Sequence, residues 1–172
     1  DGKTITYDVF GCPVDYMGSA MTWDVNGNLT SVSNKKDNIT YTYMADGQRR
    51  SKTVNGVTTT YHYNNRMLLS ETTGDETLRY YYDSTGKVAA ITYKKGEAEE
   101  KSYFYTRNAQ GDITGIYRNS DSKLIGTYEY DLWGRIVGIT ESEEGIDTDG
   151  ILEKNPLRYC GYYYDTETGF YN

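Results

Sequence analysis

Aromatic residues recur in pairs two positions apart along the chain, and this spacing constrains the fold more than any other feature. Side chains two apart on a β-strand lie on the same face, so each pair predicts one strand with both rings on one side. Met21 with Trp23 and Ile5 with Tyr7 continue the series toward the N-terminus. The tyrosine pairs are Tyr41 and Tyr43, Tyr61 and Tyr63, Tyr80 and Tyr82, Tyr103 and Tyr105, Tyr128 and Tyr130, and Tyr162 and Tyr164.

An aspartate follows several of these pairs, and a glycine comes three positions after it. An aspartate at the first position of a turn can accept hydrogen bonds from backbone amides, and glycine tolerates positive φ at the last position. The motif therefore predicts a turn that reverses the strand. Its residues are Tyr7, Asp8, Gly11, Trp23, Asp24, Gly27, Tyr82, Asp83, Gly86, Tyr130, Asp131 and Gly134, joined in the last segment by Tyr164, Asp165 and Gly169.

Apolar residues return after the glycine with a spacing of three, as in Val88 and Ile91, and this spacing predicts a bulge or twist in the returning strand. Asn55-Gly56, at the opposite end of the unit, is the sequence typical of a two-residue type I′ hairpin turn. One repeat is thus one β-hairpin. Two units are degenerate, because Met44 occupies one aspartate position and 64–66 lacks the glycine, while Asn108 replaces the aspartate in a third.

Composition agrees with an all-β fold of tandem antiparallel hairpins. Tyrosine supplies 20 residues of the 172, so the buried face is expected to consist largely of amphipathic rings, and an all-helical fold is disfavoured. Strand twist accumulates over many strands, so we expect one strongly curved sheet. The chain begins and ends within strands, which predicts a piece of a longer array with open edges, and edge-to-edge self-association.

Charge and residue counts exclude several kinds of site. A net charge of -7 disfavours a nucleic-acid partner. No apolar run is long enough to span a membrane, no signal peptide opens the chain, and no cofactor motif occurs. Two cysteines, Cys12 and Cys160, are too few for a disulfide scaffold, although their pairing is left open, and a single histidine, His62, makes a zinc site improbable.

The units WDVNGNLTSV, YDSTGKVAAI and YDLWGRIVGI resemble the YD repeat of the Rhs family. The segment NPLRYCGYYYDTETGFYN, Asn155 to Asn172, resembles the sequence that closes the Rhs core. By this resemblance, 1–154 are tandem repeats with an acidic loop at 141–154, and 155–172 are the truncated start of the closing segment.

The resemblance implies a segment of a hollow β-shell from an exported bacterial protein, similar to polymorphic toxins, toxin-complex components and teneurins. Its implied partners are the rest of the shell and an enclosed C-terminal toxin domain outside this chain. Its implied location is secreted, or at the cell surface or cell wall.

The acidic loop contains the one weak candidate for a metal site, a calcium loop with Asp147, Asp149 and Glu153 as oxygen ligands. A solvated surface loop is the simpler interpretation, because the spacing is not that of an EF-hand. His62 lies between two rings of a pair, so it is expected to face solvent. The repeated aspartates occupy identical turn positions, whereas a catalytic pair needs two different environments, so we expect no enzyme activity.

The alternative function is binding of cell-wall or other glycans. Exposed rows of aromatic rings can stack on sugar rings, and aromatic hairpin repeats of similar length occur in cell-wall-binding modules. The chain has only two tryptophans, Trp23 and Trp133, which argues against cages of the choline-binding type.

Overall fold

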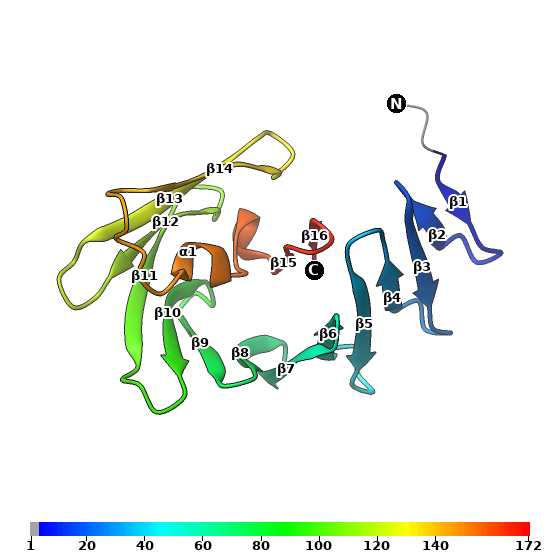
Figure 1. Ribbon diagram of the computed structural model, residues 1–172, viewed down its shortest axis with the longest axis horizontal. Coiled ribbons are helices and arrows are strands. Elements are labelled where there is room, and N and C mark those ends of the chain that lie inside the picture. The colour runs from blue at the N-terminus through cyan, green and yellow to red at the C-terminus, as the bar shows by residue number, and fades with distance from the viewer. Residues whose placement is uncertain (1–3) are drawn as a thin grey trace. The chain divides into compact units, whose positions relative to one another are not determined.

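The computed structural model describes residues 4–172 and is an antiparallel all-β fold (Figure 1). It divides into two units, residues 1–75 and residues 76–172. Within each unit the strands pair with their neighbours in the chain, so strand order is chain order. This result confirms the all-β class and the tandem arrangement of antiparallel hairpins.

The first unit contains strands β1 to β8. Their bounds are β1 Thr6–Tyr7, β2 Pro13–Tyr16, β3 Ser19–Trp23, β4 Leu29–Ser33, β5 Asn38–Tyr43, β6 Arg49–Val54, β7 Val57–Asn64 and β8 Met67–Thr73.

The second unit contains strands β9 to β14, followed by the short segments α1 and η1 and a small separate hairpin. The bounds are β9 Glu76–Tyr82, β10 Val88–Lys95, β11 Lys101–Arg107, β12 Ile113–Arg118, β13 Leu124–Tyr130, β14 Ile136–Glu141, α1 Ile151–Lys154, η1 Tyr159–Gly161, β15 Tyr164–Asp165 and β16 Phe170–Tyr171.

Both turn types follow from the local sequence. Asn55 and Gly56 have φ of 50° and 88°, the two positive values that a type I′ turn requires. After each Asp-x-x-Gly turn the register shifts by one residue, as where Val88 pairs with Tyr82 but Ala90 pairs with Tyr81. The extra residue is a β-bulge, which explains why Val88 and Ile91, three apart, are both buried. The predicted bulge is confirmed.

The first ring of each paired tyrosine in the strands is buried, and it defines the face that we call the tyrosine face of its unit. Relative exposures are between 2% and 4% for Tyr41, Tyr61, Tyr80, Tyr103 and Tyr128. Isoleucines on strands between these, such as Ile91 on β10 and Ile113 and Ile116 on β12, are 0% exposed. The core therefore combines tyrosine rings with β-branched side chains, which fit the pleated surface of a sheet.

The region from residue 141 to residue 172 departs from the sequence-based expectations in two places. The acidic loop is not solvated throughout, because Ile151 and Leu152 at its end form α1 and are buried at 0% and 2% exposure. Tyr162 and Tyr164 are not a strand pair. Tyr162 follows η1 and is 56% exposed, while Tyr164 starts β15. Among residues 4–172, no helix has the length and apolar character needed to cross a membrane.

Candidate functional site

The aspartate of the repeat motif organises its turn in the same way in four hairpins. In each, one carboxylate oxygen accepts hydrogen bonds from the amides two and four residues later, at 2.8 to 3.1 Å. The amide of the glycine donates to the aspartate carbonyl, and the glycine has positive φ. The four aspartates are Asp8, Asp24, Asp83 and Asp131. This is the turn that the spacing predicts, and it uses the carboxylate for structure.

Hydrogen bonds lower the pKa values of three of these aspartates, Asp24, Asp83 and Asp131. For Asp83, hydrogen bonds from Thr85 and Arg107 lower the pKa well below its usual range. For Asp24, the side-chain hydrogen bond from Asn28 is the main cause of the lowered pKa. For Asp131, burial raises the pKa, but hydrogen bonds from the amides of Trp133 and Arg135 outweigh that effect. A carboxylate with a lowered pKa is a poor general acid at neutral pH.

Two of the degenerate repeats keep the turn by substitution, those at Asn108 and Met44. Asn108 uses its amide oxygen as the aspartate does, accepting from the amides of Gln110 and Asp112 at 3.1 and 3.0 Å. Met44 has no such oxygen, and Asp46 instead accepts from the amide of Gln48 at 3.1 Å. The backbone hydrogen bonds of the Met44 turn are those of the other turns.

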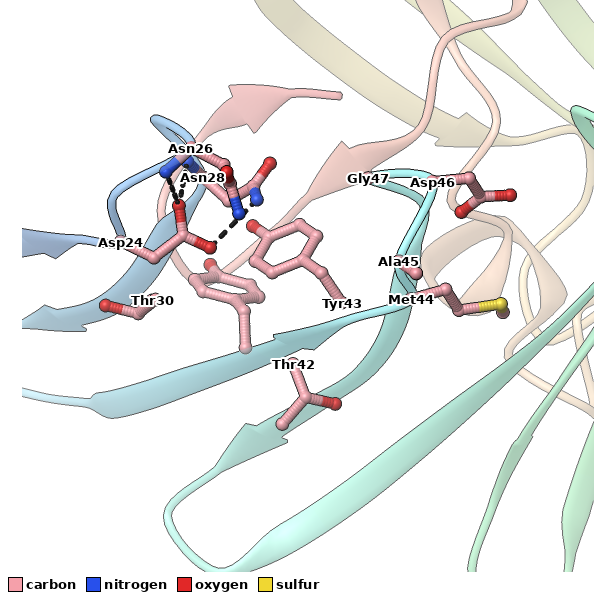
Figure 2. Close-up of a pocket in the computed structure, with 11 residues that line it drawn as sticks. Asp24, Asn26, Asn28, Thr30, Thr42, Tyr43, Met44, Ala45, Asp46 and Gly47 are labelled. Carbon is pink, nitrogen blue, oxygen red and sulfur yellow. Dashed lines mark hydrogen bonds between the residues drawn. The ribbon is translucent and has the colours of Figure 1, made fainter.

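A groove of about 570 Å³ in the first unit is bordered by two neighbouring repeat turns (Figure 2). Asp24, Asn26, Asn28 and Thr30 line one part, and residues 41–47 line the rest. Figure 2 shows Asn26 and Asn28 both bonded to Asp24. Because both oxygens of Asp24 accept bonds within its own turn, the groove offers polar contacts rather than an acid and base poised for catalysis.

The tyrosine face of the second unit holds the residues that follow β14. Figure 1 shows α1 beside strands β10 to β13. The hydroxyl of Tyr128 donates to the carbonyl of Leu152 at 2.7 Å, and the hydroxyl of Tyr105 donates to Asn155 at 2.7 Å. Tyr130 donates to the carbonyl of Ile113 at 2.7 Å. The rings therefore pack as apolar surfaces, while the hydroxyls of Tyr128 and Tyr105 hold the following segment and that of Tyr130 bonds to β12.

Asn155 is 0% exposed and forms a hub of this interaction. Its side-chain oxygen accepts from Tyr105 and from the amide of Leu157, and its side-chain nitrogen donates to the carbonyl of Leu157 at 2.7 Å. The same nitrogen lies 3.3 Å from the Tyr128 hydroxyl. A buried amide with these partners fixes the path of the chain that follows α1.

Arg158 is also 0% exposed, which is unusual for an arginine. Its guanidinium donates to the carbonyls of Asn155, Leu152 and Glu153 at 2.8, 3.0 and 3.2 Å. It also lies 4.4 Å from the centre of the Tyr128 ring, a cation–π contact. One side chain thus ties the end of α1 to the tyrosine face.

Further contacts connect the last residues to the strands. The amide of Cys160 donates to Asp112 at 2.8 Å, and the hydroxyl of Tyr171 donates to the carbonyl of Gly134 at 2.8 Å. A Cβ on Gly134 would meet the ring of Tyr159 at 2.5 Å, so the glycine of this repeat turn also makes room for the last segment.

Burial shifts the pKa values of the tyrosines in this face. Burial raises the pKa of Tyr128 to about 12, with the positive charge of Arg158 opposing it. Burial also raises the pKa of Tyr130. For Tyr171, burial raises the pKa to about 12. These hydroxyls stay protonated at neutral pH, as donors to carbonyls must.

The three carboxylates of the candidate calcium loop have separate roles. Asp147 accepts from the amides of Ile151 and Leu152 at 2.8 and 2.9 Å, capping α1. Asp149 binds Lys101 at 2.6 Å and also accepts from Tyr103. Glu153 is exposed. No group of three potential metal ligands occurs among residues 4–172, so the structure does not bring these carboxylates together.

The remaining motif residues lie as follows. Tyr7 is 60% exposed on β1, and the indole nitrogen of Trp23 donates to the carbonyl of Pro13 at 2.7 Å. Tyr82 is partly buried, which raises its pKa. Asp165 is 1% exposed. It does not form an Asp-x-x-Gly turn, because Gly169 lies four positions after it; the amide of Gly169 donates to the carbonyl of Asp165 at 2.7 Å.

The two cysteines and the histidine complete the set of candidate residues. His62 is exposed, and Cys12 and Cys160 are free thiols. Sequence reasoning missed Asn155 and Arg158 as individual residues. The sequence offered one sign of their role: Asn155 and Arg158 lie in the segment NPLR, which lacks the alternation of polar and apolar residues typical of a strand.

Comparison with known proteins connects this chain to bacterial toxins. No protein-family model matches it. It is 36% identical to the tRNA3(Ser)-specific nuclease WapA of Bacillus spizizenii and 37% identical to the tRNA nuclease WapA of Bacillus subtilis, over 98% of this chain in each case. The chain spans 7% of the length of these relatives.

Solved structures share the fold. The crystal structure of TcdB2-TccC3 matches with a TM-score of 0.67 and 16% identity, over 96% of this chain and 9% of that chain. The Tc holotoxin pore of Photorhabdus luminescens matches with a TM-score of 0.66 and 16% identity, over 96% of this chain and 8% of that chain. The sequence and fold comparisons together support a relationship to the Rhs family.

Proposed function

We propose that this chain is a wall segment of an Rhs-type β-shell, and that the shell encloses a toxin or effector domain located elsewhere in a longer exported bacterial protein. The observation that carries the proposal is the tyrosine face of the second unit. The Tyr105 hydroxyl holds a closing segment through Asn155, and the Tyr128 ring does so through Arg158, while the hairpins that present the rings pair with their neighbours in the chain. Such an arrangement builds a wall and fixes its end.

The proposal assigns no catalysis to these residues. The turn carboxylates are bonded within their turns, and the relatives named as tRNA nucleases are about fourteen times longer than this chain, from its 7% coverage. We therefore place any nuclease activity of a longer protein outside residues 1–172. Incubation of the purified chain with tRNA should leave the tRNA intact. Cleavage that is lost in His62→Ala would contradict this assignment.

Protease protection in the longer protein tests enclosure. The enclosed domain should resist a protease that digests the same domain expressed alone. Arg158→Met should increase digestion, because it loosens the closing segment, whereas Arg135→Met, at an exposed turn arginine, should not. Equal digestion of the domain inside the intact protein and in isolation would overturn the container proposal.

Secretion or surface location and self-association at open strand edges are part of the same proposal. Fractionation of the producing cells tests the first. Sedimentation of the isolated chain at several concentrations tests the second, since edge pairing predicts a mass that rises with concentration.

The alternative, a glycan-binding module, needs aromatic rings that are accessible. The first rings of the strand pairs are 2% to 4% exposed, so these rings do not form a binding platform. Any glycan site must use other aromatic residues.

A further inference from the structure

We propose that the first unit carries a binding site for a small organic carboxylate with an apolar body, in a groove beside the Met44 turn. The groove has a volume of about 580 Å³, and we call it the Arg50 groove. Its lining includes three largely apolar residues, Tyr43, Met44 and Ala45, and three polar ones, Arg50, Thr60 and His62. The site does not depend on the container proposal, because it makes no use of the closing segment.

Arg50 is a charged residue at a position of the repeat that is otherwise neutral. It is the extra residue of the β-bulge after its turn, because Thr42 pairs with Ser51 while Tyr43 pairs with Arg49. A bulge redirects a side chain, and bulges are common next to active sites. Of the bulges that follow a repeat turn in residues 4–172, only this one has a charged extra residue. The equivalent residues of the others are Val14, Thr30, Leu69, Ala89, Thr114 and Val137.

The positive charge of Arg50 has no acidic partner in the described part of the chain. Elsewhere a turn aspartate can bind an arginine, as Asp83 does with Arg107 at 2.7 Å. Met44 occupies the aspartate position of its own turn and offers no carboxylate. Among residues 4–172, the side chain of Arg50 forms no ion pair or hydrogen bond, and the groove lining contains no aspartate or glutamate. The charge that complements this groove is therefore negative.

Thr60 and His62 place two further hydrogen-bonding groups beside Arg50. Ser51, which follows Arg50, pairs with Thr60 on β7, so Arg50 lies opposite the stretch from Thr60 to His62. Both side chains are exposed. A carboxylate has two oxygens that accept hydrogen bonds, and a guanidinium can donate to both at once. The hydroxyl and the imidazole can then donate to the remaining lone pairs of the same carboxylate.

The apolar part of the lining selects an organic anion. Figure 2 shows the Met44 side chain extending away from the Asp24 turn. The hydroxyl of Tyr43 donates to the carbonyl of Leu29 at 2.8 Å, so its polar end is already bonded. Small-molecule sites have volumes of about 300–1,000 Å³, with mostly apolar walls and a few polar groups that fix orientation. The groove meets both conditions, which favours a ligand with an apolar body over an inorganic anion.

Binding of 3-phenylpropionate to the 172-residue chain tests the proposal by calorimetry and by NMR of the nitrogen-15-labelled chain. The unchanged chain should bind with a Kd of about 1 mM or below and show shifted amide signals at Ala45, Thr60 and His62. The uncharged 3-phenylpropanamide should bind at least about fivefold more weakly, because it lacks the charge that Arg50 binds.

This comparison uses the unchanged chain, so no folding defect enters it. Absence of binding at about 10 mM 3-phenylpropionate overturns the proposal, as does equal binding of the acid and the amide. Inorganic phosphate is the third probe. If phosphate binds as tightly as 3-phenylpropionate, the groove is a general anion site and the proposal of an apolar carboxylate ligand is wrong.

Arg50→Gln should weaken binding of 3-phenylpropionate by about fivefold or more. Arg66→Gln is the matched control, since Arg66 is an exposed arginine of the next repeat turn and lies outside the groove lining, and it should leave binding unchanged. Normal binding by Arg50→Gln, or an equal loss in Arg66→Gln, overturns the proposal.

Met44→Asp and Met44→Asn separate charge from shape in the groove wall. Asn108 shows that an asparagine is compatible with the turn, so both variants should keep the β-sheet content in circular dichroism. The new carboxylate of Met44→Asp should compete for Arg50 and weaken binding by about tenfold, whereas Met44→Asn should weaken it by less than about threefold. Equal affinities of these two variants would contradict an anion site at Arg50.

Discussion

The repeat hairpins and the segment from Asp147 to Asn172 are held by different kinds of contact. In the hairpins, turn hydrogen bonds join residues two or four apart, as from Asn26 and Asn28 to Asp24. The last segment has short-range side-chain hydrogen bonds too, as from Arg158 to Asn155, but it also bonds to the sheet across 24 and 50 residues, as from Tyr128 to Leu152 and from Tyr105 to Asn155. The hairpins therefore depend on local sequence, and the last segment depends on the sheet.

This difference predicts different responses to mutation. A hairpin turn can lose its aspartate and find another, as the Met44 turn does with Asp46. The last segment has few such alternatives, because Asn155 and Arg158 are buried and bond to specific partners. Damage to a turn should stay local, whereas damage to the buried polar contacts should release the whole segment.

Arg158→Met should have the largest effect. The change removes a donor from the carbonyls of Leu152, Glu153 and Asn155, of which Leu152 and Asn155 are buried, and should lower the free energy of unfolding by about 2–4 kcal/mol. Urea denaturation followed by circular dichroism measures it. Arg135→Met, at an exposed arginine, is the control and should change stability by less than about 0.5 kcal/mol. If Arg158→Met also lowers the free energy of unfolding by less than about 0.5 kcal/mol, the last segment does not depend on its buried polar contacts as described.

Gly126→Ala and Gly27→Ala together compare the cost of a steric clash with the cost of an unfavourable backbone conformation. A Cβ at Gly126 would lie 2.4 Å from the carbonyl oxygen of Thr140 and 2.5 Å from Leu152, so the cost should be about 2–3 kcal/mol. Gly27→Ala is the matched turn variant. It meets no atom within 4 Å and costs only the strain of a φ of 79°, about 1 kcal/mol. If urea denaturation shows the same loss of unfolding free energy for both variants, the clash at Gly126 costs no more than the backbone strain at Gly27.

Alkaline pH should weaken the last segment before it affects the turns. Burial raises the pKa of Tyr128 to about 12, above an unfolded value of about 10. The unfolded chain loses this proton first, so the contribution is complete below pH 10 and is lost as pH rises toward 12. The free energy of unfolding should fall between pH 9 and 12. Tyr128→Phe should make its dependence on pH less steep, by the equivalent of about one proton. An unchanged slope would show that Tyr128 does not titrate with folding.

The hairpins could be predicted from sequence because their rules are local. The pairs two apart, the Asp-x-x-Gly spacing and Asn55-Gly56 each determine a turn or a face within a few residues. The bulge followed from Val88 and Ile91 in the same way. The last segment could not be predicted, because nothing local shows that Arg158 is buried or that Asn155 meets Tyr105, which lies 50 residues away. The burial of Ile151 and Leu152 was missed because acidic residues surround them.

Asp131→Ala should have a smaller effect than Arg158→Met, Gly126→Ala or alkaline pH. It removes an acceptor that serves the amides of Trp133 and Arg135, both at 2.9 Å, and should lower Tm by about 2–4 °C. Asp131→Asn is the matched control, since Asn108 holds the equivalent turn with an amide oxygen. In a thermal scan, Asp131→Asn should lower Tm by less than half of the decrease caused by Asp131→Ala. If Asn and Ala cost the same, the carboxylate charge matters more than its hydrogen bonds.

Met44→Asp should produce the smallest change, and in the opposite direction. The turn at Met44 already has its backbone hydrogen bonds and a substitute acceptor in Asp46. An aspartate at position 44 would add the acceptor that the other turns have, but it would place a second carboxylate near Asp46. The two effects oppose each other, so Tm should rise by less than about 2 °C. In Asp46→Ala the substitute acceptor and the second charge are both absent, so adding Met44→Asp there should raise Tm by the full 2–4 °C that a turn aspartate contributes. An increase of the same size in both backgrounds would mean that Asp46 does not substitute for the missing aspartate, and the local tolerance attributed to the hairpins would then need another cause.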